Sequence, residues 1–161
     1  MANKKLAATG ALLLIPLFSL SSMAQLSGDA AAKAVDARQA NFKQIADANA
    51  PLGALARPGG VYNAEAALNG LDTIATHVEK IPALFQPNTA GYKQPKPGKY
   101  AASDTIWSAK ADFDKLAADA VAGAKKAREI LSSQGAAGLR PALAEMGGKC
   151  GACHDRFRVT L

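Results

Sequence analysis

The sequence is short of several residue types, and each shortage narrows what the protein can be. Aromatic residues make up 6% of its 161 residues, and there are only two cysteines and two histidines. Alanine, the best helix former, is frequent, whereas the residues that favour strands are few. A chain of this length and composition predicts a single all-α domain.

The first 24 residues have the pattern of a secretory leader. Two lysines precede an apolar run from Leu6 to Leu20, and Ser22-Met23-Ala24 is a small-x-small cleavage pattern. We expect residues 1–24 to be a cleaved signal peptide and residues 25–161 to form a periplasmic domain. The alternative, a membrane anchor, needs about 20 apolar residues, and this run is shorter and contains Pro16.

The charge of the remaining chain points to no special partner. Because the leader carries two lysines and no acidic residue, the formal charge of +6 falls to +4. No basic run is interleaved with aromatic residues, which argues against a nucleic-acid partner. No later segment is apolar enough to span a membrane, so we expect no membrane span in the mature form.

Four segments after the leader repeat apolar residues at helical spacing, which predicts an antiparallel four-helix bundle. The expected helices run from Asp29 to a kink or end at Pro51, from Asn63 to Pro82, from Ser103-Asp104 to Gly135, and from Leu139 to Phe157. The expected inward faces are Val35, Arg38, Phe42, Ile45, Asn49 and Leu52; then Leu71, Ile74, Val78 and Ile81; then Trp107, Phe113, Leu116, Ala120, Ala124, Ala127 and Ile130; then Leu143, Met146, Cys150 and Cys153.

One connection, from Gln86 to Ala102, has no periodicity and contains Lys93, Lys96 and Lys99 among three prolines. Loops of this length are uncommon in compact domains. We favour a mechanical role, as a long connection along the side of a bundle. A basic docking surface for an acidic redox partner is the alternative.

The last predicted helix contains Cys150-Gly151-Ala152-Cys153-His154, a C-x-x-C-H pattern. This is the pattern of covalent haem attachment. Two thiols one helical turn apart can add to the two vinyl groups of one haem, and His154, four residues after Cys150, projects from the same face. Its neutral imidazole can then bind the iron. We expect one covalent haem c, with His154 as the metal ligand.

Three other interpretations of the two cysteines are weaker. A thioredoxin-like site or disulfide would use the same C-x-x-C, but no βαβ pattern surrounds it. A structural zinc site needs four ligands, and besides the motif only His77 remains among the histidines and cysteines. A chance match is less plausible because both cysteines of an exported chain lie inside the motif.

The ligand on the far side of the iron decides the function. Electron-transfer cytochromes often use Met there, but Met146, the only methionine after the leader, lies on the same helix as His154 and is expected to be core filler. His77 lies beside an apolar stripe and is expected to face solvent. A lysine ligand remains open, with nothing pointing to one. We therefore expect a vacant or non-ligated sixth position.

The sequence resembles the cytochrome c′ family over the whole mature chain. The resemblance rests on the C-x-x-C-H motif near the end of a four-helix bundle, on Arg38-Gln39 in the first helix and on Ile106-Trp107 in the third. It implies a periplasmic haem protein of the high-spin, five-coordinate branch. Members of this family commonly form antiparallel dimers through the first helix, so the resemblance also implies a homodimer.

The resemblance also implies roles for four further residues in haem binding. The family residue nearest the iron lies four positions after the arginine, which is Phe42 here; low-spin members place Met there. Arg38 is expected to pair with a haem propionate, with Gln39 hydrogen-bonding nearby. Arg158 is expected near the exposed nitrogen of His154. The alternatives are an ordinary core aromatic for Phe42 and a solvated charge for Arg38.

These residues favour reversible binding of NO and CO. An apolar Phe42 roof would offer no hydrogen-bond donor to dioxygen and would disfavour anions and water. An enzyme is not expected, because no acid–base group is placed on that side. Single-electron transfer with a periplasmic redox protein can coexist with gas binding. The alternative is a low-spin electron-transfer cytochrome with a sixth protein ligand.

Overall fold

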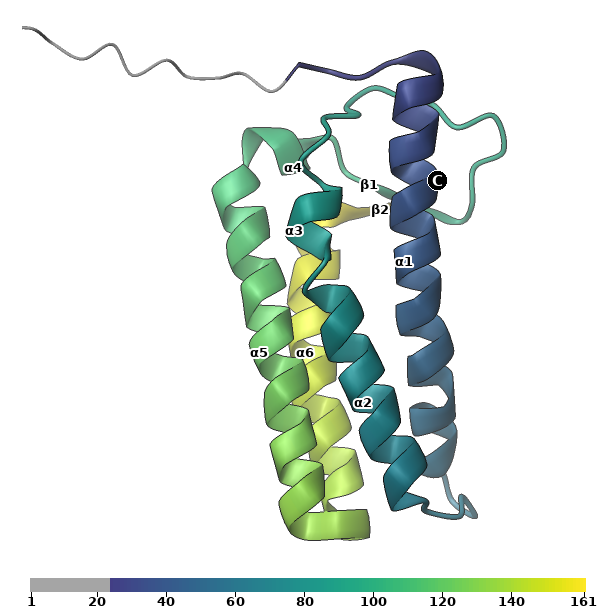
Figure 1. Ribbon diagram of the computed structural model, residues 1–161, viewed down its shortest axis with the longest axis vertical. Helices are drawn as coiled ribbons and strands as arrows, with labels where there is room; N and C mark the ends of the chain where they lie inside the picture. The colour runs from purple at the N-terminus through teal and green to yellow at the C-terminus, as the bar shows by residue number, and fades with distance from the viewer. Residues whose placement is uncertain (1–23) are drawn as a thin grey trace, which may run out of the picture.

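The computed structural model describes residues 24–161, so the leader prediction falls almost wholly outside the described residues. Four long helices run up and down and form the predicted antiparallel four-helix bundle, which is confirmed (Figure 1). These helices are α1 (Gly28–Leu55), α2 (Ala64–Val78), α5 (Lys110–Gln134) and α6 (Leu139–Phe157). Within residues 24–161, no helix has the length and apolar character needed to cross a membrane.

Several helix ends follow directly from the local sequence. The side chain of Asn63 caps α2 by accepting a hydrogen bond of 2.8 Å from the backbone N–H of Ala66. Gly135 ends α5 with φ +57°, a backbone conformation that favours glycine. A short 3₁₀ turn, η1 (Gly135–Gly138), then leads into α6, whose bounds match the prediction.

The first helix differs from the expectation at both ends. It begins at Gly28 with Ser27 as its N-cap, so Asp29 lies in the first turn and is not the cap. It also continues through Pro51 to Leu55. Proline removes one helical hydrogen bond. Pro51 is exposed, so water can satisfy the carbonyl group that loses its partner.

The second and third predicted helices are each divided. After α2 the chain makes a separate turn, α3 (Ile81–Leu84), which contains Pro82. The third predicted helix consists of α4 (Thr105–Ser108) and α5, because the backbone of Ala109 leaves the helical region. The break allows Ile106 to be buried and the indole N–H of Trp107 to donate to the carbonyl oxygen of Phe85 at 3.2 Å.

A short antiparallel ribbon closes one end of the bundle, and sequence analysis did not predict it. Strand β1 (Tyr100–Ala102) lies in the long connection, and β2 (Arg158–Thr160) directly follows α6. The pairing aligns Tyr100 with Thr160 and Ala102 with Arg158. The ribbon fastens the long connection to the end of the helix that carries the C-x-x-C-H motif (Figure 1).

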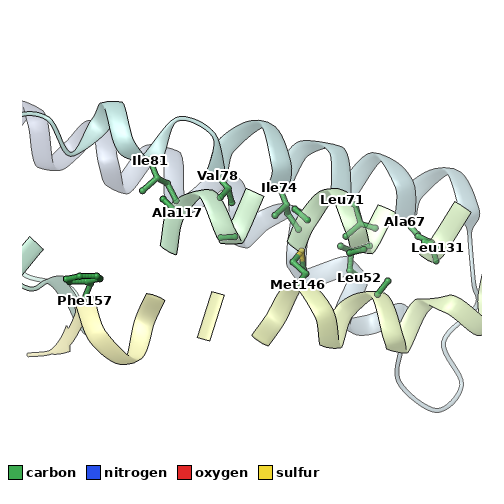
Figure 2. Packing of buried hydrophobic residues seen from close by; sticks show 14 of the residues in the cluster. Leu52, Ala67, Leu71, Ile74, Val78, Ile81, Ala117, Leu131, Met146 and Phe157 are labelled. Carbon is green, nitrogen blue, oxygen red and sulfur yellow. The ribbon is translucent and has the colours of Figure 1, made fainter. Parts of the chain in front are cut away.

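The hydrophobic core follows the inner faces of α2, α5 and α6. All four residues of the predicted α2 stripe are buried, and Figure 2 shows Leu52 of α1 reaching this core near Leu71 and Met146. Met146 is 4% exposed, which confirms its expected role as core filler. Among the described residues, α1 packs on α2 and α3, while α6 packs on α5; α1 and α6 make little contact with each other.

Candidate functional site

The two cysteines lie in the last turns of α6 with their side chains half-buried. Cys150 and Cys153 are not joined in a disulfide. Burial raises the pKa of both thiols, and the neighbouring Cys150 raises that of Cys153 further. Reactive thiols of redox enzymes have a lowered pKa. The pair therefore has the spacing of a C-x-x-C site without the electrostatics of a thioredoxin-like one.

His154 lies on the same helical face and is also half-buried. Burial lowers the pKa of its imidazole, the positive charge of Arg158 lowers it further, and Asp155 opposes both effects. The ring is therefore neutral at pH 7. A neutral imidazole has a nitrogen lone pair available for a metal ion.

Two glycines line the α6 surface beside His154, on the side away from Cys150. Gly147 and Gly151 precede His154 by seven and three residues, which places all three on one side of the helix. A Cβ atom at either glycine would meet nothing within 4 Å. This strip of bare backbone allows a flat macrocycle to lie close to the helix.

Phe42 lies on α1 and is not an ordinary core aromatic. Its side chain is 37% exposed, although most large apolar residues of the chain are buried. Its ring makes an edge-to-face contact with the ring of Phe85, with centroids 6.3 Å apart. Phe85 in turn is buried, and its ring centroid lies 4.8 Å from that of the Phe113 ring, with the two rings tilted against each other. One edge of Phe42 thus packs against a buried aromatic cluster formed by Phe85 and Phe113.

Arg38, one turn before Phe42, is buried, so the alternative of a solvated charge is wrong. It is 4% exposed. Its guanidinium group donates hydrogen bonds to Leu84 O at 2.9 Å, Pro87 O at 2.6 Å and Thr89 Oγ1 at 2.7 Å. Burial lowers its pKa to about 10, which still leaves it charged at neutral pH. Arg38 therefore fixes the start of the long connection, a role that the sequence did not reveal.

Gln39 is exposed and reaches the same connection. Nε2 of its side-chain amide donates a hydrogen bond to Oε1 of Gln94 at 2.9 Å. Both members of the Arg38-Gln39 pair thus contact residues between Leu84 and Gln94. Their expected contacts with haem propionates stay predictions.

His77 is only partly exposed and its ring has a partner inside the fold, which corrects in part the expectation that it faces solvent. It is half-buried, and its Nδ1 lies 2.7 Å from Oδ1 of Asn41. Nδ2 of Asn41 donates to the carbonyl oxygen of His77 at 2.9 Å. Because an amide oxygen only accepts, Nδ1 of His77 carries the proton. The buried Asn41 was missed because a polar residue inside an apolar stripe gives no periodic signal.

Arg158 lies in β2, where the helix has already ended. Its guanidinium carbon is 4.4 Å from the centre of the Tyr100 ring on β1. It remains close enough to His154 for its charge to lower the pKa of that imidazole. The structure therefore brings Arg158 near the motif, although on a strand and not on a continued helix.

The donor set on α6 fits a covalent haem better than a metal ion alone. Two thiols and one imidazole share a helix face that is bare on one side. Within residues 24–161, no group of three or more His, Cys, Asp and Glu side chains is placed to hold a metal ion. The structural zinc alternative therefore has no support from the described residues.

The comparison with protein families decides the identity. The family described as Cytochrome C′ matches residues 33–158. The chain belongs to the cytochrome c′ family. The match covers all four long helices almost completely, and it includes Arg38, Phe42 and the C-x-x-C-H motif.

Characterised relatives of this cytochrome c′ family member carry two names. The chain is 34% identical to cytochrome c-556 of Agrobacterium tumefaciens (strain apple 185), over 77% of this chain and 93% of that protein. It is 31% identical to cytochrome c′ of Rhodopseudomonas palustris, over 76% of this chain and 79% of that protein.

Solved structures agree with the family assignment. Cytochrome c′ of Rhodopseudomonas palustris is 29% identical with a TM-score of 0.66, covering 79% of this chain and 96% of that one. A structural model of oxidised cytochrome c556 from R. palustris is 28% identical with a TM-score of 0.69, covering 81% and 98%. As a member of this c-type cytochrome family, the chain binds haem c covalently.

Proposed function

We propose that the protein is a periplasmic cytochrome c′ whose haem iron has one protein ligand, His154, and takes up NO or CO on the opposite side. Cys150 and Cys153 are the attachment points, since the chain has no other cysteine. The haem supplies an iron that can gain or lose one electron and can bind a diatomic gas. The same protein can therefore also transfer single electrons.

The proposal rests on the contacts of the other histidine and the methionine in the described chain, His77 and Met146, which both have partners inside the fold. Met146 is buried in the core among residues of the other helices (Figure 2). His77 is paired with Asn41 through both its ring and its backbone. These contacts of the described residues support an iron without a histidine or methionine ligand opposite His154.

The polar neighbours of Phe42 on α1 are likewise engaged elsewhere. Asn41 directs its amide oxygen and nitrogen to His77. Arg38 directs Nε, Nη1 and Nη2 to the long connection. If Phe42 covers the iron, dioxygen bound there would therefore receive no hydrogen bond from Asn41 or Arg38. Water and anions would also be poorly stabilised beside the apolar ring. NO and CO need no such donor.

On the other side of the haem, the chain supplies a neutral nitrogen ligand. The burial that lowers the pKa of His154 keeps its ring deprotonated at neutral pH. Arg158 acts in the same direction, because a second positive charge nearby disfavours an imidazolium. We propose that Arg158 also influences the imidazole nitrogen that does not face the iron, as the family resemblance implies.

We also propose a cellular location and an oligomeric state for the protein. The leader pattern of residues 1–24 supports export to the periplasm, where haem c can be attached. The family resemblance supports a homodimer through α1. One solved cytochrome c′, which is 20% identical to this chain with a TM-score of 0.70, is itself described as having ligand-controlled dimer dissociation.

Optical and EPR spectra of the purified holoprotein test the open iron. We expect high-spin spectra in both oxidation states and saturable binding of CO and NO by the reduced protein. Low-spin, six-coordinate spectra in both states would overturn the proposal and leave a conventional electron carrier. Mass spectrometry of the same sample should show one haem per chain and a mature N-terminus at Gln25.

A further inference from the structure

We propose that the β1–β2 ribbon and the lysines just before it form a docking surface for an acidic electron-transfer protein. We call it the ribbon surface; Lys99, Tyr100, Arg158 and Val159 lie at the ribbon, and Lys93 and Lys96 lie in the connection that leads to it. This inference rests on the proposed haem site, because the value of the surface lies in its position next to His154.

The centre of the ribbon surface is an aromatic ring between two cations. The Tyr100 ring centre lies 4.4 Å from the guanidinium carbon of Arg158 and 5.2 Å from Nζ of Lys99. The ring is still 43% exposed. Tyrosine and arginine are the residue types that most often anchor protein interfaces. Their mutual contact keeps both side chains in place before a partner arrives.

Exposed apolar side chains are concentrated at the same place. Five large hydrophobic residues are exposed in residues 24–161, and three of them, Tyr100, Val159 and Leu161, belong to the ribbon or directly follow it. Tyr100 and Val159 point to opposite faces, since neighbouring strand positions alternate. A two-stranded ribbon exposed on both faces is marginal in water, so a partner that covers it would stabilise it.

The cations of the ribbon surface have no internal counter-ions. Among the described residues, Lys93, Lys96, Lys99 and Arg158 form no ion pair, whereas lysines and arginines elsewhere on α1, α5 and α6 do. The acidic residues closest in sequence to the two strands are Asp104 and Asp155. The surface is therefore positively charged: Lys99 and Arg158 lie beside the Tyr100 ring, and Lys93 and Lys96 precede them in the connection.

The position of this surface suits electron transfer. Arg158 is the first residue after α6 and lies four positions after His154, so the ribbon adjoins the proposed iron ligand. A partner bound over Tyr100 and Arg158 would be near the proposed haem. One electron could then leave the reduced holoprotein for an oxidised partner.

Charge selects an acidic protein over a second copy of this chain. In a symmetric dimer, the same surface faces itself, which would place the unpaired lysines and Arg158 of two chains against each other. A partner with a carboxylate-rich surface instead attracts the ribbon at long range and accelerates encounter.

The test uses oxidised plant plastocyanin, a small copper protein with an acidic surface, as the probe. Reduced holoprotein is mixed with it in a stopped-flow instrument, and the second-order rate of one-electron transfer is measured at several salt concentrations. We expect Lys93→Gln/Lys96→Gln/Lys99→Gln to slow the reaction about tenfold at low ionic strength and to flatten its salt dependence.

The matched control removes three charges elsewhere. Lys33→Gln/Lys115→Gln/Lys126→Gln changes exposed lysines of α1 and α5 and should alter the rate by less than about twofold. Equal slowing by both triple variants would show an effect of net charge alone and overturn the docking surface. An unchanged rate in the ribbon variant would also overturn it.

Further measurements separate this inference from the proposed function and from other occupants. The rate of reaction with a small neutral quinone, the spin state and the CO affinity should be the same in both triple variants; a low-spin spectrum of the unchanged protein would instead contradict the proposed function. Tyr100→Ser should weaken plastocyanin binding without changing its salt slope. If the ribbon variant no longer dimerises, the surface belongs to a contact with a second copy, and the proposal is overturned. If the variant no longer binds phosphatidylglycerol vesicles at physiological salt while its plastocyanin rate is unchanged, the surface belongs to a membrane contact, and the proposal is likewise overturned.

Discussion

The guanidinium carbon of Arg38 lies 4.4 Å from the centre of the Phe85 ring and 5.3 Å from that of Trp107. The same side chain hydrogen-bonds the chain on both sides of Phe85, at Leu84 and Pro87. The planar guanidinium group of this one α1 residue thus lies against two aromatic rings, that of Phe85 just after α3 and that of Trp107 in α4. Phe42, whose ring contacts Phe85, lies one turn further along α1.

We predict that Arg38→Lys destabilises the holoprotein by about 2–3 kcal/mol, because an ammonium group cannot satisfy three separate acceptors in a fixed plane. Urea unfolding followed by circular dichroism measures the change. Arg57→Lys, an exposed position after α1, is the control and should shift stability by less than about 0.5 kcal/mol. Equal stability of the two variants would contradict this stabilising role of the Arg38 guanidinium group.

The Phe42 prediction concerns the iron directly. Phe42→Met should convert the spectrum toward low spin and weaken CO binding at least tenfold, because a thioether near the iron competes with the gas. The control Ile45→Met places the same side chain at a half-buried position one turn away and should leave the spectrum high-spin. An unchanged spectrum in Phe42→Met would place Phe42 away from the iron.

The Asn41–His77 pair should contribute to stability without touching the haem. Asn41→Leu leaves the ring nitrogen and the carbonyl oxygen of His77 without their partner, and we expect a loss of about 1–3 kcal/mol in unfolding free energy. The spin state should not change. Asn49→Leu, exposed on the same helix, serves as the control. A shift to low spin in Asn41→Leu would show that His77 can reach the iron.

The bare strip beside His154 should matter for cofactor attachment. Gly147→Leu adds a side chain on that strip, whereas Gly148→Leu adds the same side chain about 100° further round the helix. Both changes raise helix propensity, so both chains should fold. We expect less haem per polypeptide in Gly147→Leu, measured by absorbance against protein mass. Equal loading of the two variants would contradict a haem lying on the Gly147 side.

Much of the fold follows from local sequence alone. The α2 stripe, the Asn63 cap, the end of α5 at Gly135 and the bounds of α6 each depend on residues within a few positions of one another. The C-x-x-C-H motif is equally local, since one helical turn sets the spacing of its thiols and imidazole. Such features depend on backbone geometry and hydrogen bonding that short segments already determine.

The remaining features required contacts between distant segments. The sequence offers Arg38 a haem propionate or solvent, and not the three acceptors that the connection after α3 supplies from 46 to 51 residues away. Asn41 and His77, 36 residues apart, became a pair only when α1 packed against α2. The ribbon pairs residues 100–102 with residues 158–160, which lie far apart in the sequence. Sequence by itself determined the helices and the haem motif, because periodicity and spacing are local. Tertiary structure decided which polar groups are buried, because the energy of burying a polar group depends on partners that only the folded chain supplies.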